Sequence, residues 1–162
     1  MNDPDESVGF LVGDVARLLR RNFNGKAQTL GLSQAQWQAL AYLARQEGVN
    51  QVTLAESLEI QPMTLARLID RLQEAGMVSR QSDPEDRRAF RLYLTAAAQP
   101  LLDQMWALAG KTRDEAMVGM RDDTKQILIE ALRHVKRNLI EAESEDDRAK
   151  PEKAFSNAAG HN

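Results

Sequence analysis

The apolar residues between Gln61 and Thr95 change their period once, at Gly76, and this change restricts the possible folds more than any other feature of the sequence. Before Gly76 they recur three and four positions apart, which is the period of an α-helix with one buried face. Pro62 suits the first position of this helix, and Gly76 suits a left-handed stop. The apolar positions are Leu65, Leu68, Ile69 and Leu72.

After Gly76 the period becomes two, which predicts β-strands. Residues 77–81 can form the first strand, and in the second, over 90–95, apolar residues alternate with polar ones. The residues between them, 82–89, are polar and charged and predict a turn. We therefore expect a helix followed directly by a small β-hairpin.

Two further helices are expected before Pro62. Ser33 and Gln36 have the spacing of a capping box, and Thr53 and Glu56 repeat this spacing in front of a short apolar segment. The middle of the chain then has the order helix, helix, helix, hairpin. This order predicts a mainly α fold with a small β-hairpin, built as a winged helix-turn-helix over residues 32–95.

Amphipathic helices are also expected on both sides of this domain, over residues 1–31 and 96–142. A break is expected near 119–123, and Pro100 predicts that the helix containing it kinks or begins late. These outer helices have more apolar surface than one small core uses, so we expect them to be dimerisation helices that bury it against a second copy of the chain.

The acidic residues gather near the end of the chain. Six acids and three bases lie from Glu141 onward, and because the chain has 24 acids and 21 bases, residues 1–140 hold 18 of each. Residues 143–162 have no periodicity and are rich in acids, Ala, Ser and Asn, so we expect a disordered acidic tail.

Composition argues against an enzyme. The chain has no cysteine and only two histidines, His134 and His161, which excludes thiolate chemistry and leaves few ligands for a metal. It has no Gly-rich phosphate loop and no nucleophile beside a base. We expect no catalytic residue, no metal site and no cofactor.

The sequence shows neither a membrane span nor a secretory signal. Apolar runs are far shorter than the roughly 18 residues of a membrane span. The first seven residues are acidic and lead into no secretory segment. We expect a cytoplasmic protein with no membrane partner.

Two stretches, "MTLARLIDRLQEAGMVSR" (63–80) and "DPEDRRAFRLYLT" (83–95), resemble the multiple antibiotic resistance regulator (MarR) family of bacterial transcription factors. The flanking helices resemble this family over almost the whole chain except the tail. The resemblance implies a homodimeric transcriptional regulator that binds double-stranded DNA.

The outer face of the predicted helix after Pro62 suits the major groove of DNA, where Arg67 can form a forked pair with guanine. The resemblance implies that Arg87, in the wing, enters the minor groove, and that Arg88 pairs with Asp70 to orient the wing. The predicted DNA-binding residues are Gln61, Met63, Thr64, Arg67, Arg71 and Arg87.

Charge over 61–95 is nearly balanced, with six bases and five acids. We therefore expect each subunit to bind DNA with modest, salt-dependent affinity. We expect the dimer to read a near-palindromic DNA sequence whose half-sites are roughly 34–36 Å apart. The six bases are Arg67, Arg71, Arg80, Arg87, Arg88 and Arg91.

The resemblance also implies a repressor that a small, often aromatic, effector releases from DNA. Predicted effector-binding residues, for each of which plain core or dimer packing is the alternative, are Phe10, Arg17, Trp37, Met105 and Trp106. The alternative function is a winged-helix module that docks proteins without binding DNA. A recognition face with cations argues against that alternative.

Overall fold

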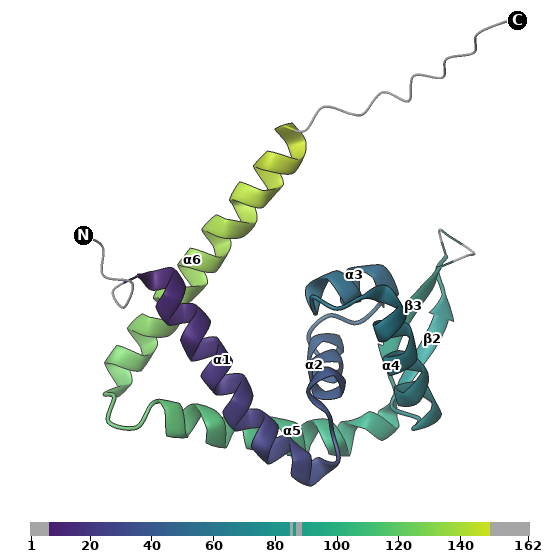
Figure 1. Cartoon of the computed structure of the whole chain (residues 1–162), viewed down its shortest axis with the longest axis horizontal. Coiled ribbons are helices and arrows are strands. Elements are labelled where there is room, and N and C mark those ends of the chain that lie inside the picture. Colours follow the sequence, from purple (N-terminus) through teal and green to yellow (C-terminus); the bar gives the residue numbers. More distant parts are fainter. Residues whose placement is uncertain (1–6, 85, 87–88, 150–162) are drawn as a thin grey trace, which may run out of the picture. The chain divides into compact units, whose positions relative to one another are not determined.

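The computed structural model describes residues 7–84, 86 and 89–149, with side chains up to Glu145 (Figure 1). The chain divides into two compact units, residues 1–116 and 117–162. The first unit contains five helices and three strands of the described residues. Their bounds are α1 Val8–Ala27, α2 Gln34–Leu43, β1 Val49–Asn50, α3 Gln51–Ser57, α4 Pro62–Glu74, β2 Val78–Ser82, β3 Phe90–Leu94 and α5 Gln99–Ala116.

The starts of α2 and α3 show how local hydrogen bonds set helix boundaries. The predicted capping box at α2 is confirmed: Gln36 N donates to Ser33 Oγ at 3.3 Å, and Ser33 N donates to Gln36 Oε1 at 2.9 Å. The predicted cap at Thr53 is wrong. The cap of α3 is Asn50, whose Oδ1 accepts from Thr53 N at 2.8 Å, so Thr53 lies inside the helix. Asparagine caps helices as well as threonine does, and it comes first along the chain.

Helix α4 begins and ends where its sequence predicts. Pro62 is its first residue, and Gly76 has a φ of +72°. The Met77 amide donates to the Leu72 carbonyl and the Gly76 amide donates to the Gln73 carbonyl, both at 2.9 Å. This pair of bonds is the Schellman motif, which satisfies the last carbonyls of the helix.

The predicted hairpin is part of a three-stranded antiparallel sheet with the order β1-β3-β2. Val78 pairs with Leu94 and Ser82 with Phe90, which confirms the hairpin. The two-residue strand β1, where Val49 pairs with Leu92, was not predicted. A strand of two residues is too short to show a period in the sequence, and its pairing depends on a partner more than forty positions away.

Helix α5 begins at Gln99, after a 3₁₀ turn over Ala96–Ala98. Pro100 is therefore its second residue, where a missing amide proton removes no helical hydrogen bond. The prediction that the helix containing Pro100 begins late is confirmed.

A single hydrophobic core joins the winged helix-turn-helix to α1 and α5. Buried residues of α1 and α5, namely Phe23, Ala27, Leu102 and Met105, belong to the same cluster as Leu40, Leu54, Leu65, Ile69 and Leu92. Figure 1 shows α1 and α5 crossing, and they pack against each other. The expected boundaries at 31 and 96 therefore do not separate independent packing units.

The second unit contains α6, Asp122–Ala149. The helical structure is interrupted between the end of α5 at Ala116 and the start of α6 at Asp122, which agrees with the break predicted near 119–123. Helix α6 continues to Ala149, so the expectation of a disordered tail from residue 143 is wrong as far as Ala149, and 150–162 lie outside the described residues. In the described part of the chain, no helix combines the length and the apolar composition needed to span a bilayer.

Candidate nucleic-acid interface

Helix α4 separates its residues into a buried face and an exposed face. Leu65 and Ile69 are fully buried and Leu72 is 2% exposed, so the inner face belongs to the core. The outer face includes all five predicted DNA-binding residues of this region: Gln61, Met63, Thr64, Arg67 and Arg71 are exposed. An α-helix anchored on one side and polar on the other has the shape that the major groove accepts.

Arg67 and Arg71 are unpaired among the described residues: neither has a hydrogen bond or an ion pair to another described side chain. Both guanidinium groups therefore remain available to an external acceptor. The predicted minor-groove residue Arg87 and the predicted orienting residue Arg88 lie outside the described residues.

Asp70, on α4, has Arg80 of β2 as its partner. Arg80 Nη2 lies 2.7 Å from Asp70 Oδ1, and the Arg80 side chain is 19% exposed. Its Nε donates to Gln51 Oε1 and its Nη1 donates to Gln73 Oε1, both at 2.9 Å. One guanidinium thus connects β2 to α3 and α4, and the pairing of Asp70 with Arg88 stays a prediction because Arg88 lies outside the described residues.

Arg91, on β3, is also held inside the unit. Its Nε donates to Asp83 Oδ2 at 2.9 Å and its Nη2 to Asp83 Oδ1 at 3.3 Å. Asp83 is only 10% exposed, and Arg91 Nη1 reaches the Gly48 carbonyl at 3.4 Å. The two-point pair joins β3 to the start of the hairpin turn, and the contact with Gly48 connects β3 to the segment before β1.

The sequence therefore overcounts the cations that this surface offers to DNA. It treats Arg80 and Arg91 like Arg67 and Arg71, whereas the structure places the first two in internal polar contacts. Sequence reasoning also missed the roles of Gln51 and Gln73. No local signal identifies them, because a glutamine that binds an arginine seven or more positions away has no characteristic spacing.

The five predicted effector residues are not brought together within one chain. Met105 is 1% exposed and belongs to the core, and Trp37 packs on Phe23 with ring centroids 4.6 Å apart. Phe10 precedes Phe23 by thirteen residues of α1, about 20 Å along the helix. Phe10 and Trp106 are exposed, at 67% and 44%. Arg17, also exposed, pairs with Asp14 at 2.9 Å.

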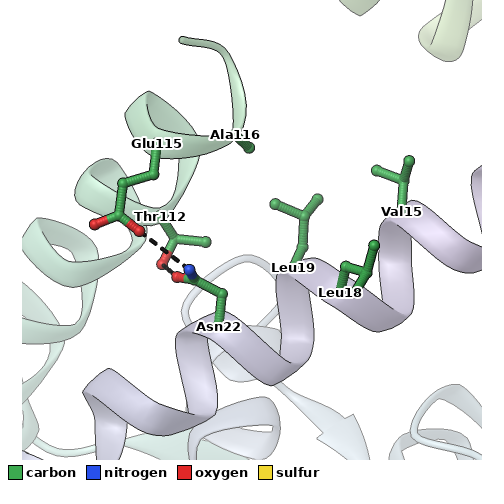
Figure 2. Close-up of a pocket in the computed structure, with 7 residues that line it drawn as sticks. All are labelled: Val15, Leu18, Leu19, Asn22, Thr112, Glu115 and Ala116. Atoms are coloured by element: carbon green, nitrogen blue, oxygen red, sulfur yellow. Dashed lines mark hydrogen bonds between the residues drawn. The ribbon is translucent and has the colours of Figure 1, made fainter.

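A cavity of about 340 Å³ lies between α1 and α5 (Figure 2). Its apolar lining consists of Val15, Leu18 and Leu19 of α1 and Ala116 of α5, and the remaining lining residues form a polar cluster. None of the predicted effector residues lines this cavity. A second cavity, of about 490 Å³, lies beside Arg20, Gln34, Ser57 and Glu59, and none of the predicted effector residues lines it either. The polar cluster of the first cavity consists of Asn22, Thr112 and Glu115.

This polar cluster joins the two helices. Thr112 Oγ1 donates to Asn22 Oδ1 at 2.9 Å, and Asn22 Nδ2 donates to Glu115 Oε2 at 3.1 Å (Figure 2). Lys26 Nζ lies 2.7 Å from Glu115 Oε2. The hydrogen bond from Lys26, and then that from Asn22, lowers the pKa of Glu115 below its usual value. The cluster therefore favours an ionised Glu115.

Comparison with known proteins connects this geometry to a family. The model of the MarR family matches residues 32–90. A solved transcriptional regulator, PA3341, is 33% identical, with coverage of 83% of this chain and 99% of that one and a TM-score of 0.71.

Two further solved structures support the same assignment. A MarR-family regulator from Silicibacter pomeroyi is 28% identical over 84% of this chain and 92% of its own, with a TM-score of 0.71. Wild-type MarR from E. coli, in its apo form, is 25% identical over 80% and 96%, also with a TM-score of 0.71. On the family match and these identities over nearly whole chains, this protein belongs to the MarR family of transcriptional regulators, and its fold is that of a DNA-binding regulator.

Proposed function

We propose that this chain recognises a specific sequence in double-stranded DNA by inserting α4 into the major groove. The observation that carries the proposal is the outer face of α4, where Arg67 and Arg71 are exposed and unpaired among the described residues. A guanidinium in this position forms a forked pair with guanine, and the polar residues near the helix start suit phosphates or base edges.

We also propose that the protein acts as a homodimer. Apolar side chains on α1 and α6 are exposed in the single chain, and two such stripes exceed the scattered apolar residues of an ordinary surface. The apolar side chains of α1 and α6 with the greatest exposed fraction are Val8, Phe10, Leu11, Val12, Val15, Ile127, Leu132, Leu139 and Ile140. Two copies related by a two-fold axis place two α4 helices roughly 34–36 Å apart, which suits a near-palindromic operator.

The experiment that tests DNA recognition measures fluorescence anisotropy with a random duplex and with duplexes enriched from fragmented host DNA, each over a range of salt concentrations. We expect salt-sensitive binding to both and tighter binding to the enriched duplexes. A protein-docking module shows no such binding, so a flat response across salt contradicts the proposal. Sedimentation of the same sample measures the dimer, and a monomer at micromolar concentration contradicts that part.

The third part of the proposal is that the protein is a repressor released by a small effector in the α1–α5 cavity. A volume of about 340 Å³ falls within the range of small-molecule sites, and apolar walls with a few polar groups suit an aromatic ligand. Phe10 and Trp106 remain proposed contacts of such an effector where a partner copy completes the wall. The effector weakens DNA binding only if it prefers the arrangement of α1 and α5 that binds DNA less well.

A cavity-filling variant tests this part. A panel of benzoates and phenols is screened for release of the enriched duplex, and we expect at least one to weaken binding by the parent. Leu19→Trp fills the cavity wall and should remove this response, while Arg21→Trp, at an exposed position of the same helix outside the cavity and outside the apolar stripe, should keep it. Equal responses of both variants contradict the location of the site, and no response of the parent to the panel contradicts the ligand class. Loss of transcription from a reporter operator on adding the protein checks repression.

A further inference from the structure

The polar contacts of Arg80 carry an inference about how Arg67 stays available to DNA. Arg80 lies on β2, and its side chain is mostly buried. It has acceptors on α3, from Gln51, and on α4, from Gln73 and Asp70. A guanidinium has five N–H donors in a fixed plane, so contacts on two sides determine its orientation. The contacts with Gln51 and Gln73 therefore hold the Arg80 guanidinium in place independently of its contact with Asp70.

Asp70 has a second cation within reach along its own helix. Arg67 precedes Asp70 by three positions on α4, and residues at this spacing are neighbours on a helix surface. Asp70 is 56% exposed, so its carboxylate is open to solvent as well as to Arg80. Arg67 nevertheless has no ion pair among the described residues, and the described partner of Asp70 is Arg80.

We propose that Arg80 is a positioning residue for DNA binding, which acts by holding Asp70 away from Arg67. This inference rests on the proposed function, in which Arg67 contacts DNA. Without Arg80, Asp70 pairs with Arg67 and competes with guanine or phosphate for it. The unpaired carboxylate also repels the DNA backbone. Arg80 itself does not contact DNA.

The two partners of this ion pair should therefore have opposite effects on DNA binding. Arg80→Gln removes the cation and releases Asp70, and we expect affinity for the selected duplex to fall about tenfold, a factor that lies within the discrimination that a forked arginine–guanine pair contributes. Asp70→Asn removes the competitor, and we expect affinity equal to or tighter than that of the parent. The double variant Arg80→Gln/Asp70→Asn should recover most of the loss.

A general loosening of the fold predicts a different pattern. If the pair only orients α4, Asp70→Asn weakens binding as much as Arg80→Gln, and the double variant is no better than either; this result overturns the inference. Arg91→Gln is the matched control, because it breaks an arginine–aspartate pair in the same sheet that does not touch α4. Arg67→Ala should abolish discrimination at particular base pairs of the selected duplex. Arg91→Gln should discriminate at these same base pairs as the parent does.

Three readouts keep these outcomes separate. Circular dichroism checks folding, and if Arg80→Gln is unfolded, Asp70→Asn alone decides, since a loss of affinity there contradicts the inference. The slope of log affinity against log salt on random DNA should fall by about 0.9 if Arg80 itself contacts a phosphate, and this fall would also overturn the inference. Absence of selectivity in the parent protein refutes the proposed function instead.

Discussion

The outer face of α4 and the adjoining sheet each contain two arginines, but only those of α4 are unpaired among the described residues. Arg67 and Arg71 project from the exposed side of a helix, whereas Arg80 and Arg91 lie on β2 and β3 and bind side chains of other elements. Equal charges in one short stretch of sequence thus have different roles. A count of cations therefore does not measure the charge available to a polyanion.

The physical reason lies in what surrounds each position. A residue on the exposed face of a helix has side-chain neighbours only along that helix, at three and four positions away. A residue in a sheet has neighbours on adjacent strands and on the helix that covers the sheet. Arg80 and Arg91 therefore find acceptors that are distant in the sequence, and partial burial strengthens these contacts relative to exposed pairs.

The largest expected effect is on sequence discrimination by Arg67. Arg67→Ala should weaken the selected duplex by about 1–3 kcal/mol and leave random DNA much less affected, because the forked pair with a base is lost. Anisotropy with duplexes mutated one base pair at a time measures this. Arg113→Ala, which removes an exposed arginine of α5, is the control and should discriminate like the parent. Equal discrimination by Arg67→Ala and the parent would remove Arg67 from the interface.

Arg91 should behave in the opposite way. Arg91→Met should reduce the free energy of unfolding by about 1–2 kcal/mol, because the nearly buried Asp83 loses a two-point partner, without changing the salt slope on random DNA. Urea denaturation provides the measurement. Arg17→Met breaks the exposed pair with Asp14 and should change stability much less. A reduced salt slope for Arg91→Met would show that this arginine also binds phosphate.

Arg71 should change nonspecific affinity more than stability. Arg71→Ala should weaken binding to all duplexes by a similar factor and reduce the salt slope by about 0.9, as expected for one lost phosphate contact. Titrations at four or more salt concentrations measure the slope, and the unfolding midpoint should stay near that of the parent. A change in discrimination at one base pair, with an unchanged slope, would instead assign Arg71 to a base.

The weakest effect is predicted for Lys26 of α1, a cation that pairs with Glu115 of α5. Because the pKa of Glu115 is lowered in the folded protein, its contribution to stability is present above the usual value of 4.5 and is lost as the pH falls through the lowered pKa. Lys26→Met should therefore be less stable than the parent at neutral pH, and the difference should narrow below about pH 4.5. Urea midpoints from pH 3 to 7 measure it, and a constant difference would contradict this role of the pair.

Several parts of the fold could be predicted from the sequence because they depend on neighbouring residues. The capping box at Ser33, the first position of α4 at Pro62 and the stop at Gly76 all involve hydrogen bonds or backbone angles within a few residues. The start of α3 could not be predicted in this way. Asn50 and Thr53 both have capping side chains, and Asn50, which pairs with Arg91 of β3, has the extended backbone of an N-cap residue.

The candidate interface shows the same division. The alternation of buried and exposed positions along α4 identified Arg67 and Arg71 as exposed, because the helical period alone places them opposite Leu65 and Ile69. The effector residues were not identified in this way. Apolar residues such as Met105 have the same helical spacing whether they line a cavity or fill the core, and only packing between elements distinguishes the two.

Sequence patterns were enough for the order of the helices and the hairpin, the ends of α4 and the face that α4 exposes, since periodicity and capping act over a few residues. Only the tertiary structure decided which arginines are free, because Arg80 meets Gln51, 29 positions away, and Arg91 meets Gly48, 43 positions away. Charge in a folded chain is assigned by spatial neighbours, and the polypeptide must fold before those neighbours exist.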